Sequence, residues 1–180
     1  MQNLYTRYPL SSLLIYNGVT VLHYSLGGIG LILGYNFTWY AYLLGVSYLV
    51  FAFGQMYVMM PLVVCPTCVY PRLDNALCIS GLNVVAKRVA KPGNIKDFAR
   101  IRGEGLLCHN NLYMAAKIFP IVAMLPALFL NFSWLLLTLF LAVVGLLVYR
   151  IFVIFPKIAC VHCRAKNICP NARSMKLSDK

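Results

Sequence analysis

The sequence predicts an all-α integral membrane protein: four transmembrane helices arranged as two tandem helical hairpins, with a small cysteine-rich cytoplasmic cap. The first observation is composition, since 61% of the 180 residues are hydrophobic and 11% are charged. Soluble domains have about 45–50% apolar and about 25% charged residues. The other two observations are four long apolar stretches and an internal repeat. Together they indicate a multi-pass protein in the lipid bilayer.

The apolar residues fall in four stretches, at residues 10–34, 39–64, 111–130 and 134–155. Each is near the roughly 20 residues that a helix needs to cross a hydrocarbon core. The first stretch is longer than the apolar core of about 7–15 residues in a signal peptide, so we expect it to be retained as a membrane span.

The net charge of +12 is distributed unevenly along the chain. Seven basic residues lie between the second and third stretches and six follow the fourth, whereas the two short hairpin turns have none. This asymmetry follows the positive-inside rule, which predicts that both termini and the long loop are cytoplasmic, most simply in a prokaryotic inner membrane. Orientation and attraction to anionic lipid explain the charge, and we expect no nucleic-acid partner.

An internal repeat with an offset of 95 residues links the two halves of the chain. The words NFTW (residues 36–39) and NFSW (residues 131–134) contain the only two tryptophans, and each tryptophan precedes a C-x-x-C pair by 26 residues. A helix over this distance is roughly 38 Å long, which slightly exceeds the roughly 30 Å hydrocarbon core. We therefore expect each tryptophan at one interface and each cysteine pair beyond the other. Copies with the same orientation favour a pseudo-two-fold axis along the membrane normal.

Each copy of the repeated four-residue motif is typical of the start of a helix. Either Asn36 or Thr38, and either Asn131 or Ser133, can cap the first free amides of the helices that begin at the tryptophans. Pro61 and Pro156 also obey the offset, each four positions before its cysteine pair. A proline there is expected to kink or end the helix.

These features divide the chain into four parts: 1–64, the first hairpin; 65–110, a basic cysteine-containing loop; 111–156, the second hairpin; and 157–180, a basic cysteine-containing tail. Within the loop, residues 80–91 are typical of a short basic amphipathic helix that ends at Pro92 and Gly93. Asn94 is placed to cap a second short helix that runs to about Arg102. The loop thus predicts a cap over the cytoplasmic end of the helices.

The cysteines indicate a metal site. Reduced cytoplasmic thiols rarely form structural disulfides, and two C-x-x-C pairs provide the four thiolates that Zn²⁺ or an iron–sulfur cluster requires. Three further cysteines and an adjacent histidine extend the choice of ligands. The candidate metal ligands are Cys65, Cys68, Cys78, Cys108, Cys160, Cys163, Cys169 and His109.

The identity of the metal is open between iron and zinc. Cys169 is followed by Pro170, and this Cys-Pro pair also ends the cysteine runs of ferredoxin-like proteins, although the spacing before it differs. This resemblance favours a 4Fe–4S cluster as the cofactor. The alternative, zinc, would use the same ligands.

Polar residues inside the predicted spans are candidate ligand-binding residues: His23, Gln55 and Arg150. His23 can join two helices by a hydrogen bond or serve a quinone or proton path; a haem is not expected, since no second histidine lies at membrane depth. The offset maps Arg150 onto Gln55. Arg150 can either snorkel to the headgroups or face inward and bind an anion or a quinone carbonyl, whereas Lys117 is expected to snorkel.

The leading functional interpretation is a membrane electron-transfer subunit, not necessarily catalytic, that exchanges electrons with a soluble partner and with a quinone. One alternative is a zinc-stabilised scaffold or assembly subunit. Another is a cytoplasm-facing thiol–disulfide oxidoreductase, because Cys65-Pro66-Thr67-Cys68 resembles the active dithiol of glutaredoxin-like proteins. The small size of the chain favours other subunits of a membrane complex, or a homodimer, as partners.

Overall fold

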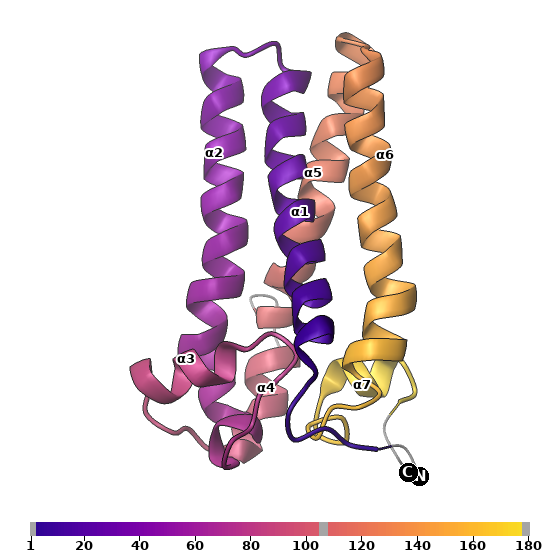
Figure 1. Cartoon of the computed structure of the whole chain (residues 1–180). Helices are drawn as coiled ribbons and strands as arrows, with labels where there is room; N and C mark the ends of the chain where they lie inside the picture. The colour runs from indigo at the N-terminus through magenta and orange to yellow at the C-terminus, as the bar shows by residue number, and fades with distance from the viewer. Residues whose placement is uncertain (1–2, 105–107, 178–180) are drawn as a thin grey trace.

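The computed structural model describes residues 3–104 and 108–177, and this part of the chain is helical and contains no strand. Four long helical segments stand side by side, and short helices gather at one end (Figure 1). The long segments are α1 (Leu10–Gly34), α2 (Trp39–Phe53) with its continuation η1 (Gly54–Val64), α5 (His109–Leu130), and α6 (Trp134–Tyr149) with its continuation η5 (Arg150–Ala159).

Three helices within the described residues are long and apolar enough to cross a membrane, namely Trp39–Thr67, His109–Leu130 and Trp134–Ala159. The sequence predicted four. The helix α1 has 25 residues, which is long enough, but it contains glycines and polar residues such as Asn17 and His23 and is not among these three. The membrane character is thus supported by three helices of the bundle.

The helix α1 lies at the centre of the bundle and contacts α2, α5 and α6. Glycines allow the closest approach between α1 and α2. A Cβ atom added at Gly45 would lie 3.0 Å from the carbonyl oxygen of Gly28 and 2.5 Å from a side-chain carbon of Ile32. The small-residue face of α1 therefore permits close helix packing, as in membrane helix pairs.

The two helices that start at the tryptophans are capped as predicted. The Thr38 hydroxyl accepts a hydrogen bond from the Ala41 amide at 3.3 Å, and the Ser133 hydroxyl accepts one from the Leu136 amide at 3.1 Å. Trp39 and Trp134 are 75% and 77% exposed. Both side chains are therefore free to contact lipid headgroups.

The helices do not end at the two prolines, as one of the predicted outcomes had it, but continue past them as π-helices. Pro61 lies inside η1 and Pro156 inside η5. The amide of Cys65 donates to the carbonyl of Met60, and the amide of Cys160 donates to that of Phe155 at 2.8 Å, each five residues back. A proline has no amide hydrogen to donate. In the wider turn of a π-helix, the amides that follow bond to carbonyls five residues back, so the helix can continue past the proline. Both cysteine pairs thus begin at the end of a π-helix.

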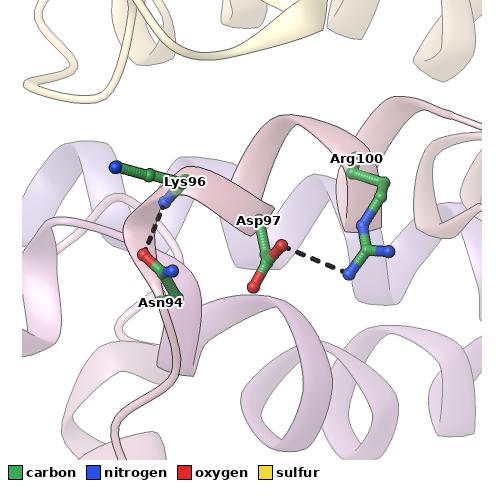
Figure 2. A network of polar contacts seen from close by, with 4 residues as sticks. All are labelled: Asn94, Lys96, Asp97 and Arg100. Carbon is green, nitrogen blue, oxygen red and sulfur yellow. Dashed lines mark hydrogen bonds and ion pairs between the residues drawn. The ribbon is translucent and has the colours of Figure 1, made fainter.

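The short helices form the cap, at the end of the bundle opposite the two hairpin turns (Figure 1). They are η2 (Cys65–Thr67), η3 (Tyr70–Arg72), α3 (Leu82–Val89), η4 (Ile95–Asp97), α4 (Phe98–Gly103) and α7 (Pro170–Ser174). The predicted capping of a short helix by Asn94 is confirmed, since its side-chain oxygen accepts a hydrogen bond from the Lys96 amide at 3.1 Å (Figure 2). One turn later, Arg100 pairs with Asp97 at 3.2 Å (Figure 2).

The segment before α1 joins the cap to the C-terminal region. The Tyr5 amide donates to the carbonyl of His162 at 2.9 Å, and the Tyr8 amide donates to that of Leu77 at 2.9 Å. The Tyr8 side chain is buried. Three distant parts of the sequence are therefore held together at the cap end of the bundle.

Candidate functional site

Six of the seven cysteines line one cavity between the cap and the ends of the long helices. The cavity has a volume of about 90 Å³ and is walled by η1, η5, α4, α7 and the segment before α1. We call it the cysteine cavity. Its cysteines, three from each half of the chain, are Cys65, Cys68, Cys78, Cys160, Cys163 and Cys169.

The two C-x-x-C segments have the same local backbone geometry. The Cys68 amide donates to the Cys65 carbonyl at 3.0 Å, and the Cys163 amide donates to the Cys160 carbonyl at 3.2 Å. In each segment the second sulfur also interacts with a backbone amide two residues further on, that of Tyr70 or Ala165. Amide hydrogen bonds favour the thiolate form that a metal requires.

The cavity brings the two halves into contact, although it holds no ready-made ligand set. Cys68 and Cys163 both pack against Tyr70 and its neighbours, and their thiolates are close enough to repel one another. Cys78 lies close to both Cys65 and Cys68. Within residues 3–104 and 108–177, no three Cys, His, Asp or Glu side chains are arranged to hold one metal ion. The thiols share the walls of one cavity without converging on one point.

Burial keeps the thiols of Cys68, Cys160 and Cys163 protonated. Desolvation raises the pKa of Cys160 to about 11 and that of Cys163 to about 12, and neighbouring thiols, Cys169 among them, add to both shifts. Desolvation also raises the pKa of Cys68. A metal that binds here must therefore displace protons from the sulfurs.

Two cations line the same cavity, Arg102 and Lys166. The Nε atom of Arg102 is buried without a hydrogen-bond partner, and the guanidinium carbon lies 5.9 Å from the centre of the Phe98 ring. Burial alone would lower the pKa of Arg102, but attraction to acidic groups around it, above all Cys169, raises it. Lys166 is buried as well. The cavity therefore has positive charge ready to neutralise thiolates.

The remaining candidate ligands lie elsewhere. Cys108 is buried at the start of α5 and does not line the cavity. The adjacent His109 forms a hydrogen bond through its Nδ1 atom with the side-chain amide of Gln55 at 2.7 Å and stacks on Tyr113. Thus Gln55 and His109, which the sequence left unrelated, connect η1 to α5.

Arg150 faces the interior of the bundle rather than the headgroups. It is 1% exposed, donates to the Thr20 hydroxyl, and donates from Nη1 to the Tyr16 carbonyl at 3.4 Å. Its guanidinium carbon lies 4.3 Å from the centre of the Tyr16 ring and 5.4 Å from that of Tyr113. Of the two orientations open from the sequence, the structure shows the inward one.

The expected snorkelling of Lys117 is wrong, because its side chain is also 1% exposed. The Nζ atom lies 4.6 Å from the centre of the Tyr24 ring and 4.9 Å from that of Tyr113, and it has no hydrogen-bond partner. Lys117 points toward α1 and therefore reaches aromatic rings instead of headgroups. We call Lys117, Arg150, Tyr16, Tyr24 and Tyr113 the cation–tyrosine cluster.

His23 joins two helices. Its Nε2 atom forms a hydrogen bond with the carbonyl of Lys117 at 3.1 Å, which links α1 to α5. The histidine is buried beside the cation–tyrosine cluster, since its ring lies 5.9 Å from that of Tyr24.

Sequence reasoning missed the tyrosines, Arg102 and Lys117 as site residues. A signal was present in the first apolar stretch, where Tyr16, Thr20, His23 and Tyr24 recur at helical spacing and share one buried face. No such pattern pointed to Arg102, which is one of many basic residues in the loop.

Comparisons with family models, with curated proteins and with solved structures find no match to this chain.

Proposed function

We propose that this chain is a membrane electron-transfer protein whose cysteine cavity holds a 4Fe–4S cluster on the cytoplasmic side. The observation that carries the proposal is the lining of one cavity by six thiols, drawn equally from the two halves of the chain. Four thiolates satisfy one such cluster. Binding requires side-chain rotation that turns four of the six sulfurs inward.

The charges around the cavity suit this cofactor. Four thiolates give a 4Fe–4S cluster a net negative charge, and hydrogen bonds to the sulfurs tune its reduction potential. Arg102 and Lys166 line the cavity, and backbone amides approach the sulfurs of Cys68 and Cys163. These cations and amides would thus stabilise the negative charge of the bound iron–sulfur cluster.

The proposed arrangement in the membrane includes α1 as a fourth span. The polar residues Thr20 and His23 of α1 are buried against neighbouring helices, whereas its exposed large residues, among them Leu14, Leu22 and Ile29, are apolar. A central helix buries its polar face in protein and needs only its outer face to suit lipid. With four spans and the positive-inside rule, the cap and both termini are cytoplasmic.

A pseudo-two-fold axis along the membrane normal is part of the same proposal. Equivalent positions 95 residues apart have equivalent roles: Thr38 and Ser133 as caps, Pro61 and Pro156 within π-helices. One equivalent pair is in direct contact, since the Asn36 Nδ2 atom donates to the Asn131 Oδ1 atom at 2.9 Å. Contact between equivalent residues is expected only on or near a symmetry axis.

Structural zinc is the second candidate, because the same six thiols come from distant segments of the chain that meet at the cavity, where a zinc ion would cross-link them. In that case the protein is a scaffold or assembly subunit of a larger membrane complex, and the metal contributes folding energy. A dithiol oxidoreductase receives less support. Burial raises the pKa of Cys68 and of Cys163, the second cysteine of each pair, whereas reactive thiols have a lowered pKa.

Metal analysis of the full-length protein, purified anaerobically in detergent, tests the proposal. We expect about four iron and four sulfide per chain, and an EPR signal after reduction with dithionite. Cys68→Ala and Cys163→Ala should each lose most of the iron, whereas the matched control Cys108→Ala, outside the cavity, should keep it. Zinc without iron would establish the second candidate. Iron that survives both cavity replacements would reject the cavity as the site.

A further inference from the structure

The cation–tyrosine cluster contains more buried donors than acceptors. Among the described residues, five buried polar atoms of this cluster have no hydrogen-bond partner: the Nζ atom of Lys117, the Nε and Nη2 atoms of Arg150, and the hydroxyls of Tyr24 and Tyr113. The side chains of Lys117, Arg150 and Tyr24 are at most 1% exposed and come from α5, η5 and α1. A buried donor without an acceptor costs free energy, and an unpaired charge costs more.

Within residues 3–104 and 108–177, no carboxylate pairs with these two cations. The acidic residues of this part of the chain, Asp74, Asp97 and Glu104, all lie outside the long helices. Lys117 and Arg150 both lie against the Tyr113 ring and are close enough to repel each other. A group that supplies acceptor oxygens without donors of its own would satisfy them.

The surroundings restrict the chemistry of that group. The donors are set among the rings of Tyr16, Tyr24, Tyr113 and Phe155, which suit a flat apolar ring better than a hydrated ion. The cation–tyrosine cluster also lies deep within the helical bundle, since Arg150 begins η5, ten residues before Cys160, and is buried. A ligand that dissolves in lipid reaches this depth most easily.

The cluster adjoins the cysteine cavity. Tyr16 and Phe155 line that cavity, and their ring centres lie 4.3 Å and 5.2 Å from the guanidinium carbon of Arg150. Two aromatic rings thus stand between the thiols and the buried cations. A redox-active ligand at the cluster would be within a short electron-transfer distance of a cofactor in the cavity.

We propose that the cation–tyrosine cluster is the binding site for a quinone head group, whose carbonyl oxygens accept hydrogen bonds from Lys117 and Arg150. The electron-exchange part of this inference rests on the proposed function, whereas the binding part does not. Reduction of the quinone to the quinol would take up two electrons and two protons. An iron–sulfur cluster held by the cavity cysteines would supply the electrons, one in each of two oxidations, and water would supply the protons.

The test measures binding of decylubiquinone to the full-length protein in detergent by equilibrium dialysis. We expect saturable binding to the wild type, and a dissociation constant raised about tenfold or more in Lys117→Met, which removes the charged donor and keeps the length of the side chain. Lys157→Met is the matched control, because Lys157 is an exposed lysine on η5, and its affinity should stay within about twofold of wild type.

A second measurement separates a binding site from a purely structural role. If Lys117 contacts no quinone, Lys117→Met only relieves a buried unpaired charge, so the protein becomes more stable while quinone affinity is unchanged; that result would overturn the proposal. Binding of bromide in place of the quinone, lost in the same variant, would also overturn it.

The outcome is distinguishable from that of the proposed function. In protein that holds the iron–sulfur cluster and has been reduced with dithionite, decylubiquinone should reoxidise the iron–sulfur cluster more slowly in Lys117→Met than in wild type. The iron content and the EPR signal should stay equal. Absence of iron would reject the proposed function and leave the dialysis result to decide the quinone site. Equal reoxidation rates in protein with intact clusters would reject the quinone site alone.

Discussion

The thiols of Cys160 and Cys163 are each subject to opposing effects of their surroundings. At Cys163, loss of hydration raises the pKa to about 12, although a hydrogen bond from the Ala165 amide acts in the other direction. At Cys160, desolvation raises the pKa to about 11, while the charges of Arg102 and Arg150 lower it. Without metal, both thiols are therefore protonated at neutral pH and unreactive, and a bound metal ion replaces the protons.

This chemistry predicts how the metal-free protein reacts with iodoacetamide. Only the thiolate reacts, so the rate at Cys160 should rise with pH until about pH 11 and the rate at Cys163 until about pH 12. Mass spectrometry of digested protein after timed alkylation measures each site. Rates that level off near pH 9 in the folded protein, as expected for the unfolded control, would contradict the burial argument.

The same shifts predict the stability of the metal-free protein at alkaline pH. A raised pKa means that the folded state holds its protons more tightly than the unfolded state. The stabilisation is complete below the ordinary thiol pKa of 9.0 and is lost as the pH rises toward about 11 and 12. The free energy of unfolding should therefore fall across this range, and the fall should be smaller in a Cys160→Ala, Cys163→Ala double variant.

At the scale of elements, the helices after the two hairpin turns use the same solution at their start. Thr38 and Ser133 each satisfy an amide of the first turn, and each is followed by an exposed tryptophan. A helix end in a bilayer cannot leave such amides unpaired without cost. The repeated cap therefore contributes to stability in both halves of the chain.

Removal of either capping hydroxyl, that of Thr38 or that of Ser133, should lower the free energy of unfolding by a similar amount. We expect Thr38→Ala and Ser133→Ala each to lower the free energy of unfolding by about 1 kcal/mol. Reversible unfolding in mixed detergent and SDS micelles measures the change. Thr138→Ala is the control, because its hydroxyl bonds only to the carbonyl of Trp134, one turn earlier in the same helix. A control as costly as the caps would refute the capping role.

Close packing of α1 against α2 depends on a glycine. Gly45→Ala places a Cβ atom against a backbone oxygen of Gly28 that cannot move away cheaply, so we expect a loss of about 1–3 kcal/mol. Gly145→Ala is the matched helical control, since its Cβ atom would meet nothing within 4 Å. There we expect no loss, or a gain of up to about 1 kcal/mol. Equal melting temperatures for both variants would show that the helices separate readily.

At the scale of the whole molecule, the cap consists of parts that are far apart in the sequence. The segment before α1, the long loop and the C-terminal region are joined by backbone hydrogen bonds such as those from Tyr5 to His162 and from Tyr8 to Leu77. The cysteine cavity lies where these parts meet the helix ends. Its integrity therefore depends on the complete bundle.

The proposed orientation is testable in intact cells. Phe37→Cys introduces a thiol at an exposed position of the first hairpin turn, and Arg88→Cys introduces one at an exposed position of α3 in the cap. A membrane-impermeant maleimide should label the first variant from outside and the second only after the membrane is permeabilised. The wild type corrects for native cysteines. Labelling of both variants from outside would refute four spans with a cytoplasmic cap.

Much of the fold was predictable because it depends on local chemistry. Helix starts at Trp39 and Trp134 follow from capping residues next to long apolar stretches, and the cap at Asn94 follows from a similar pattern. The continuation of the helices past Pro61 and Pro156 as π-helices was not predictable, because a missing amide can end a helix or be tolerated within a widened turn. Which of the two occurs depends on how the whole helix packs.

The candidate site was predictable only in part. The paired, repeated cysteines indicate a shared site, and the structure places them on one cavity, whereas Cys108 and His109 lie apart from it. The positions of Arg102, Lys117 and Arg150 depend on which way a helix faces within the bundle. One charged residue among many in a basic chain carries no local sign of that direction.

The sequence by itself determined the apolar character, the cap positions and the spacing that puts each cysteine pair at a helix end, because these follow from composition and from the rise of a helix. Only the tertiary structure decided that two cations face inward onto tyrosines and that six thiols share one cavity with Arg102. These features arise from contacts between residues as distant as Tyr16 and Arg150, and the packing of all the helices decides which side chains meet.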